Sequence, residues 1–240
     1  MRKYSNYILL FPISITLMLL LSCGAGYNKY ADQYYDEGLI FYEKMEYDRS
    51  IDSFTKVLEV EPYGKDNHLV YYNLGMAYFK NRQYDESIYQ FTKALEIISE
   101  KANKRKFNIL EWRGNAYQRN NDFDYAIKDY SDAIQLIPKH ENIKSIYHNR
   151  AWIWLKKGNY DKAIEDFSSA ISIDSEFDAS YYGRAYVWYK KADFQRALID
   201  AKESAKLSPA NKKYDDLLYE IKSSVFMQIA FPSSVPVTPD

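Results

Sequence analysis

Few side chains in this 240-residue sequence have both the type and the spacing that chemistry requires. The three histidines, His68, His140 and His148, do not stand at i, i+4, and no cysteine accompanies them, so they lack the pattern of a zinc site. The only cysteine is Cys23, in the stretch LLSC that ends an uncharged apolar run at 8–21. The chemistry of this sequence therefore centres on one thiol near its start.

The rest of the sequence contains no familiar catalytic pattern. G-x-S-x-G, H-E-x-x-H and a phosphate-binding glycine loop do not occur. The stretch NNDFDYAIKD at 120–129 has acidic residues at alternate positions, as a calcium loop does, but it lacks the required glycine and terminal glutamate. We therefore expect a protein that is not an enzyme and that has no metal and no cofactor.

The first 22 residues predict an exported protein. Arg2 and Lys3 precede the apolar run, whose 14 residues would rise only about 21 Å as a helix, against about 30 Å for a membrane core. A basic start, a short apolar core and small residues after it are typical of a secretory signal peptide. The alternative is an uncleaved anchor with an incidental cysteine, which Pro12 makes less favourable.

The stretch LLSC resembles the lipobox of bacterial lipoproteins. This resemblance implies that the signal peptide, 1–22, is removed and that Cys23 becomes a lipidated N-terminus, with 23–30 as a short membrane tether. Two or three acyl chains anchor a protein durably. Gly24, next to the cysteine, resembles lipoproteins that are sent to the outer membrane, so we expect a bacterial membrane lipoprotein on the outer membrane, facing the periplasm.

The charge balance excludes one class of partner. Loss of Arg2 and Lys3 with the signal peptide lowers the formal net charge from −1 to −3. A nucleic-acid-binding protein would show a basic surplus, so we expect no nucleic acid. The basic run at 101–106 is expected to be a solvated surface, with contact to anionic lipid as the less favoured alternative.

A motif recurs along the remaining chain. Segments that begin at Tyr71, Leu110, Tyr147 and Tyr181 share an aromatic or leucine, a small residue four positions later, an aromatic three further on, and then an [AS]-[IL] pair. The pattern resembles the tetratricopeptide repeat, a 34-residue helical hairpin. The implied units are 31–64, 68–101, 107–140, 144–177 and 178–211. A helix at 212–230 is expected to cap them, and the proline-rich tail at 231–240 is expected to be disordered. The fold class is all-α, a right-handed α-solenoid of about five hairpins.

Each recurring position has a physical reason. Small residues stand where the two helices of a hairpin cross, because a small side chain lets the backbones approach closely. These crossing residues are Gly38, Gly75, Gly114, Ala151 and Ala185. Rings sixteen positions later are expected to fill the space between hairpins. They are Phe54, Phe91, Tyr130 and Phe167.

In proteins with this repeat, the first helix of each hairpin lines a concave groove with side chains that flank the crossing residue. The resemblance implies a groove lined by Tyr35, Leu39, Tyr42, Tyr72, Asn73, Met76, Phe79, Trp112, Asn115, Gln118, His148, Asn149, Trp152, Tyr182, Tyr186 and Tyr189. Rings offer large contact area at low entropy cost, and amides can bond an extended backbone. The set therefore predicts a peptide-binding groove.

The expected function is that of a lipid-anchored, non-catalytic scaffold. Its partner would be an envelope protein or a peptide segment of one, and it would meet the membrane through its lipid anchor. The alternative is a carrier or transport accessory that holds a small apolar ligand, or docks a solute-binding protein, in the aromatic groove. A third reading is a structural role in which the C-terminal helix occupies the groove.

Overall fold

The computed structural model describes residues 29–230, and every regular element within them is an α-helix. The chain divides into two compact units, at 1–64 and 65–240. Unit 1 contains one hairpin, formed by α2 (Lys29–Glu43) and α3 (Tyr47–Val60). The first of these helices includes the last two residues of the expected tether at 23–30. The signal peptide, Cys23 and the tail at 231–240 lie outside the described residues.

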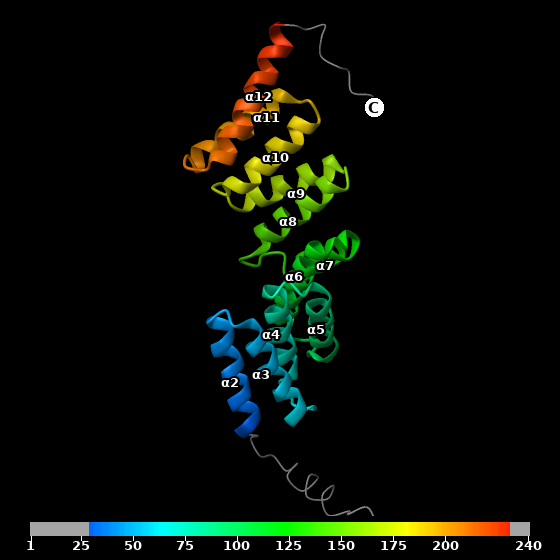
Figure 1. The fold of residues 1–240 in the computed structure, drawn as a ribbon. Helices are drawn as coiled ribbons and strands as arrows, with labels where there is room; N and C mark the ends of the chain where they lie inside the picture. Colours follow the sequence, from blue (N-terminus) through cyan, green and yellow to red (C-terminus); the bar gives the residue numbers. More distant parts are fainter. Residues whose placement is uncertain (1–28, 231–240) are drawn as a thin grey trace, which may run out of the picture. The chain divides into compact units, whose positions relative to one another are not determined.

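Unit 2 consists of four further hairpins and a C-terminal helix (Figure 1). Its helices are α4 (Asn67–Lys80), α5 (Tyr84–Ile97), α6 (Asn103–Asn120), α7 (Phe123–Leu136), α8 (Ile143–Lys156), α9 (Tyr160–Ile173), α10 (Asp178–Lys190), α11 (Phe194–Leu207) and α12 (Lys212–Ala230). We call α4, α6, α8 and α10 the first helices, and α5, α7, α9 and α11 the second helices. Each second helix packs on its own first helix and on the first helix that follows it. The expected all-α fold of stacked hairpins is confirmed.

Close approach of a ring explains the glycines at the helix crossings. A Cβ added to Gly75 on α4 would lie 2.7 Å from the ring of Phe91 on α5. The hydroxyl of Ser87 also donates a hydrogen bond of 2.8 Å to the carbonyl oxygen of Gly75. Unit 1 repeats the arrangement, since a Cβ on Gly38 would lie 2.6 Å from the ring of Phe54. A larger residue at these crossings would displace a fully buried phenylalanine.

The turn inside each hairpin contains one residue with a positive φ. These residues are Met45, Arg82, Asn121, Gly158 and Ala192, with φ values of 61°, 63°, 67°, 74° and 57°. Glycine adopts this conformation freely, whereas a residue with a Cβ does so at a cost of roughly 1–2 kcal/mol. The hairpins therefore share one turn geometry, and only the turn at Gly158 has a glycine at this position.

Three arginines of unit 2 each form an ion pair inside their own hairpin and a hydrogen bond to the preceding hairpin. Arg150 donates to both carboxylate oxygens of Asp166, over 2.8 and 2.7 Å, and to the hydroxyl of Ser131 over 2.8 Å. One guanidinium therefore joins α8 to its own second helix, α9, and to the preceding one, α7. The same arrangement joins Arg113 to Asp129 and Thr92, and Arg184 to Asp200 and Ser168. Bidentate geometry and burial make these pairs more specific than exposed ones.

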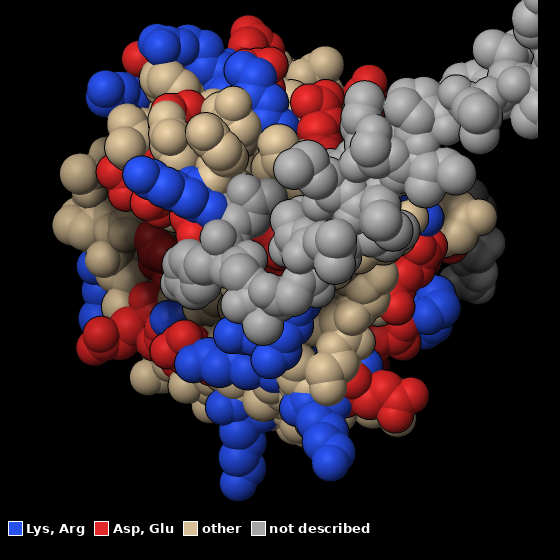
Figure 2. All heavy atoms as spheres, turned by 90° about the horizontal axis from the view of Figure 1, so that it is seen from below, with Lys and Arg blue, Asp and Glu red and all other residues tan. Residues whose placement is uncertain are grey.

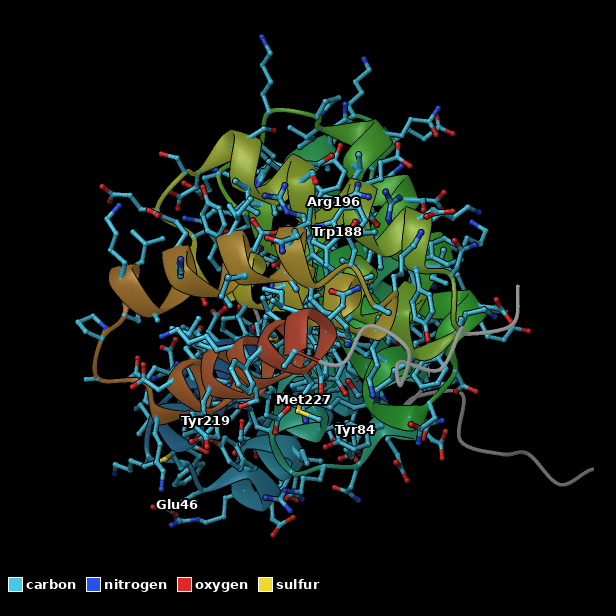
Figure 3. The ribbon with its side chains drawn as sticks, turned by 90° about the horizontal axis from the view of Figure 1, so that it is seen from above. Glu46, Tyr84, Trp188, Arg196, Tyr219 and Met227 are labelled. Carbon is cyan, nitrogen blue, oxygen red and sulfur yellow. The ribbon has the colours of Figure 1, made fainter. Side chains whose placement is uncertain are left out.

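Helix α12 packs as the first helix of a further hairpin would. It lies mainly against α11 and, to a lesser extent, against α10. Leu217 and Ile221 are buried in a cluster with alanines of α10 and α11. Tyr219 and Met227 on the same helix are exposed (Figure 3). One face of α12 thus completes the packing of the last hairpin, as a cap does.

The surface carries both signs of charge. Basic and acidic side chains are interspersed over the face that Figure 2 shows. Within residues 29–230, none of the helices has both the length and the apolar character needed to span a membrane.

Candidate functional site

The predicted groove residues of unit 2 lie on its four first helices. We call them the row: Tyr72, Asn73, Met76, Phe79, Trp112, Asn115, Gln118, His148, Asn149, Trp152, Tyr182, Tyr186 and Tyr189. Each of them is half-buried. Because successive first helices touch, side chains from neighbouring helices meet along the row. They form a ring cluster at each end and an amide cluster between.

The C-terminal ring cluster centres on Trp152 of α8. Its ring centroid lies 6.2 Å from that of Tyr182 and 6.3 Å from that of Tyr186, both on α10. Beneath it, Phe167 of α9 meets the indole in a T-shaped contact of 5.6 Å. Tyr214 of α12 stacks on Tyr182 with a centroid distance of 5.0 Å. The cap helix therefore extends this cluster by one ring.

His148 supports Trp152 from the same helix. The indole N–H of Trp152 donates to Nε2 of His148 over 3.0 Å, and Nδ1 of His148 lies 2.9 Å from the hydroxyl of Ser180. Burial lowers the pKa of His148 to about 4, with Asp178 opposing the shift. The imidazole is therefore neutral at pH 7, with its proton on Nδ1, and it acts as a positioning group.

The amide cluster forms around the hydroxyl of Tyr130, which comes from α7. This hydroxyl lies 2.6 Å from Oδ1 of Asn115 and 3.0 Å from Oε1 of Gln118. Asn149 of α8 donates to the same Oδ1 over 3.2 Å. Burial raises the pKa of Tyr130, so the phenol keeps its proton. Within residues 29–230, the amide nitrogens of Asn115 and Gln118 donate to no other group, so they remain available as donors.

The N-terminal ring cluster of unit 2 lies on α4 and α6. Phe79 and Trp112 meet in a T-shaped contact of 5.3 Å, and Tyr72 lies 5.8 Å from Phe91. Met76 packs against the same buried phenylalanine cluster. A cavity of about 140 Å³ opens beside Tyr72, and its lining includes Arg105.

The predicted residues of unit 1 make contacts within their own hairpin. Tyr35 meets Phe54 at 5.6 Å, and Tyr42 meets Tyr47 at 5.6 Å. Leu39 is 36% exposed. The structure describes these three side chains within unit 1 alone, and the row is defined on unit 2.

Two groups in the site were not among the predicted groove residues. Tyr130 was expected only as a ring between hairpins, but its hydroxyl organises the amides of the row. The signal was tyrosine at a position where three other hairpins have phenylalanine. Tyr214 was expected only as a cap residue, and no sequence pattern indicated that it would stack on the row.

The described part of the chain contains side chains suited to binding. Within residues 29–230, no group of three or more His, Cys, Asp or Glu side chains is arranged to hold a metal ion. His140, which was considered as a ligand, stacks on Phe107 with a centroid distance of 3.8 Å. The row itself offers rings, amide donors and one neutral imidazole, which suit binding of a segment with both apolar and backbone groups.

Comparisons with known proteins agree with the fold. One model of the tetratricopeptide repeat matches residues 68–100 and 145–177, and a second model of the same repeat matches 107–140. These segments correspond to the hairpins α4–α5, α8–α9 and α6–α7. A search of the curated proteins finds no match.

Solved structures share the architecture at low sequence identity. The crystal structure of MamA protein is 18% identical, with 89% of this chain and 100% of that chain covered and a TM-score of 0.65. YrrB, described as a TPR protein with an unusual peptide-binding site, is 18% identical over 88% of this chain and 98% of its own, with a TM-score of 0.65. A tetratricopeptide repeat protein from Parabacteroides merdae ATCC 43184 is 16% identical over 87% and 82%, with a TM-score of 0.72. Such likeness shows the fold alone. Together with the matched repeat models, it shows that this chain contains tetratricopeptide repeats.

Proposed function

We propose that this protein is a lipid-anchored, non-catalytic scaffold of the bacterial cell envelope, and that it binds an extended segment of another envelope protein along the row. The observation that carries the proposal is the order of side chains on the first helices. A ring cluster, an amide cluster and a second ring cluster follow one another along unit 2.

This order matches what an extended peptide offers. Apolar side chains of a partner would lie against the rings, and its backbone carbonyls would accept hydrogen bonds from Asn115 and Gln118. The tetratricopeptide repeat is a family of interaction modules, and YrrB is described as having a peptide-binding site. Both points support a peptide or protein partner for this chain.

A carrier of small ligands is less well supported. Small-molecule sites enclose roughly 300–1,000 Å³. The cavity beside Tyr72 measures about 140 Å³ and lies at one end of the row. The half-buried rings are better suited to side chains of a bound segment than to an enclosed ligand.

The lipid anchor rests on the sequence around Cys23. Its test is metabolic labelling with an alkyne fatty acid, followed by detergent phase separation. We expect label on the native protein and none on Cys23→Ala, which should also keep its signal peptide and run as a larger species. Equal labelling of both forms would contradict the proposed anchor. Fractionation of inner and outer membranes tests the proposed location.

The binding face is tested by photocrosslinking in cells. A photoreactive residue at Gln118 or Tyr186, on the row, should yield a discrete crosslinked product. The matched positions are Trp154 and Trp188, which lie on first helices but face Lys162 and Arg196 of the second helices; Figure 3 shows the pair of Trp188 and Arg196. They should yield none. The product should also disappear when Trp152→Ala is added and persist with Trp154→Ala, with circular dichroism confirming folding. Products from the control positions alone would place binding on another face.

A further inference from the structure

Charge is segregated between the two sets of helices in unit 2. The four first helices carry 11 basic and 2 acidic residues, a formal net charge of +9. The four second helices carry 6 basic and 11 acidic residues, a formal net charge of −5. Arg113, Arg150 and Arg184 are neutralised by aspartates of the second helices, which leaves the first helices a formal net charge of +6. The almost neutral total of the chain therefore conceals a basic set of helices, and this set bears the row.

The basic surplus includes one residue at the same place in every first helix. Five positions after each crossing residue stand Lys80, Arg119, Lys156 and Lys190. All four are exposed, and within residues 29–230 none of them lies within ion-pair distance of a carboxylate. A basic residue in the last turn stabilises a helix by about 0.3–1 kcal/mol, because it interacts favourably with the helix dipole. This effect explains why the residues are basic, but it does not explain why none of them pairs with a carboxylate within that range.

The neighbouring lysines behave differently. Lys157 pairs with Asp124 over 2.7 Å, and Lys191 pairs with Asp161 over 2.6 Å. Each pair joins the residue that caps the C-terminus of a first helix to the second helix of the preceding hairpin. The ion pairs between hairpins are thus made by the residue one position later, and Lys156 and Lys190 stay unpaired beside them.

Several cations lie directly beside the row. The ammonium of Lys80 is 5.7 Å from the ring centroid of Trp112, and that of Lys190 is 5.2 Å from Tyr186. From α12, the ammonium of Lys213 lies 4.7 Å from the centroid of Tyr182. Rings and positive charges therefore form one surface.

Both acidic residues of the first helices are engaged within the protein. Glu111 accepts a hydrogen bond of 3.4 Å from Asn142, and Asp178 accepts one from Ser208. Asp178 also accepts from the backbone of Ala179. Neither carboxylate neutralises the basic residues at the other end of these helices.

We infer that the segment bound along the row is acidic: an extended stretch in which Asp or Glu recurs about every third residue, with apolar or aromatic residues between. The inference rests on the proposed function. Packed helices lie about 8–10 Å apart, and an extended chain advances about 3.3 Å per residue. Carboxylates three residues apart would therefore meet the basic residues of successive first helices, while the intervening side chains contact the rings.

The test is selection from a random library of displayed peptides of roughly 12 residues, enough to span the four first helices. The full chain in detergent micelles serves as bait. Enriched peptides should be rich in Asp and Glu at intervals of about three. Their affinity is then measured by fluorescence anisotropy at low and high salt, and by comparison with versions in which Glu becomes Gln.

Two variants that lose the same number of positive charges show whether the first helices are responsible for peptide affinity. One carries Lys80→Gln, Arg119→Gln, Lys156→Gln and Lys190→Gln on the first helices. The control carries Lys93→Gln, Lys128→Gln, Lys162→Gln and Lys202→Gln, one on each second helix. We expect affinity to fall about tenfold or more in the first variant and less than twofold in the control. Equal effects in both variants would overturn the inference, since they would reflect net charge alone.

The outcomes separate the two proposals. Enriched peptides that need Trp152 and Tyr186 but lack acidic residues would overturn the acidic partner and leave the binding face standing. Peptides that bind equally well without these rings, or no enrichment at all, would overturn both. Binding of the chain to phosphatidylglycerol vesicles that is lost in the first-helix variant, without acidic peptides, would instead assign the basic surface to a membrane.

Discussion

The indole N–H of Trp152 donates to Nε2 of His148, one helical turn away on α8, over 3.0 Å. This bond requires an unprotonated Nε2, and it places the ring proton on Nδ1, beside Ser180. The indole of Trp152 is thus held in place by His148, which must stay neutral to accept this bond. Protonation of His148 would remove the acceptor on which Trp152 depends.

Stability should therefore fall in acid through His148. Burial lowers its folded-state pKa to about 4, below the unfolded value of about 6.5. Between these values the unfolded chain binds a proton that the folded chain does not, so stability is retained above pH 6.5 and is lost as pH falls toward 4. The loss is on the order of 3 kcal/mol. Urea denaturation from pH 7.5 to 4 measures it.

The variant His148→Asn provides the control. It should be less stable than the native protein at pH 7 but should show a shallower decline between pH 6.5 and 4. Some decline should remain, because burial also lowers the pKa of His68. An unchanged slope in the variant would assign the acid sensitivity to other groups.

Removing one member of the pair of Arg150 and Asp166 should lower the free energy of unfolding strongly, whereas replacing both members with apolar residues should lower it little. Asp166→Ala leaves Arg150, whose side chain is only 17% exposed, without its carboxylate, which costs about 3–5 kcal/mol. The double variant Arg150→Met, Asp166→Leu should recover most of that loss, since apolar side chains avoid the desolvation of two charges. Ser131→Ala, which removes one hydrogen bond, should cost about 1 kcal/mol. Free energies of unfolding in urea decide the order; a double variant less stable than the single one would contradict it.

Gly158 and Ala192 occupy equivalent turns, and exchanging glycine and alanine at these positions should change stability in opposite directions. Gly158→Ala forces a Cβ into a turn with φ of 74° and should destabilise by about 1 kcal/mol. This cost comes from backbone conformation alone, because a Cβ there meets nothing within 4 Å. Ala192→Gly relieves the same strain at φ of 57° and should stabilise by a few tenths to about 1 kcal/mol. Melting temperatures of the two variants give both signs in one experiment. Destabilisation by both substitutions would show that the turns are not equivalent.

Helix α12 should contribute through one face. Ile221 is fully buried against α11, so Ile221→Ala should cost about 2–4 kcal/mol. Ile229 is 74% exposed on the same helix, and Ile229→Ala should change stability by less than about 0.5 kcal/mol. Neither variant replaces a residue of the row, so peptide binding by the folded protein should remain. Equal costs would mean that α12 is packed on both faces.

The fold was predictable because its rules are local. A small residue at each helix crossing and a ring sixteen positions later recur in the sequence, and the structure shows the contact that links them, as between Gly75 and Phe91. Turn geometry was harder to predict. Met45 and Ala192 take positive φ because the hairpin demands it, although neither residue type favours that conformation.

The site was predictable in its members but not in its connections. The stripe of side chains on each first helix followed from the repeat, so the rings and amides could be named in advance. That Tyr130 would bond Asn115, or that Tyr214 would stack on Tyr182, depends on how closely the facing helices approach each other. The ion pair of Arg113 and Asp129 was missed, although the same sixteen-residue spacing recurs in the pairs of Arg150 and Arg184.

The buried guanidinium links described for Arg113, Arg150 and Arg184 also bear on how unit 2 comes apart. In a repeat array, stability is the sum of terms within repeats and terms between neighbours, and each of these arginines adds to both. Helix α12 has no such link within the described residues and is held by apolar and ring contacts with α10 and α11. Partial opening should therefore start at the cap. Backbone amides at 212–230 should exchange with solvent deuterium well before those of α6 to α9, which should open together as one cooperative block.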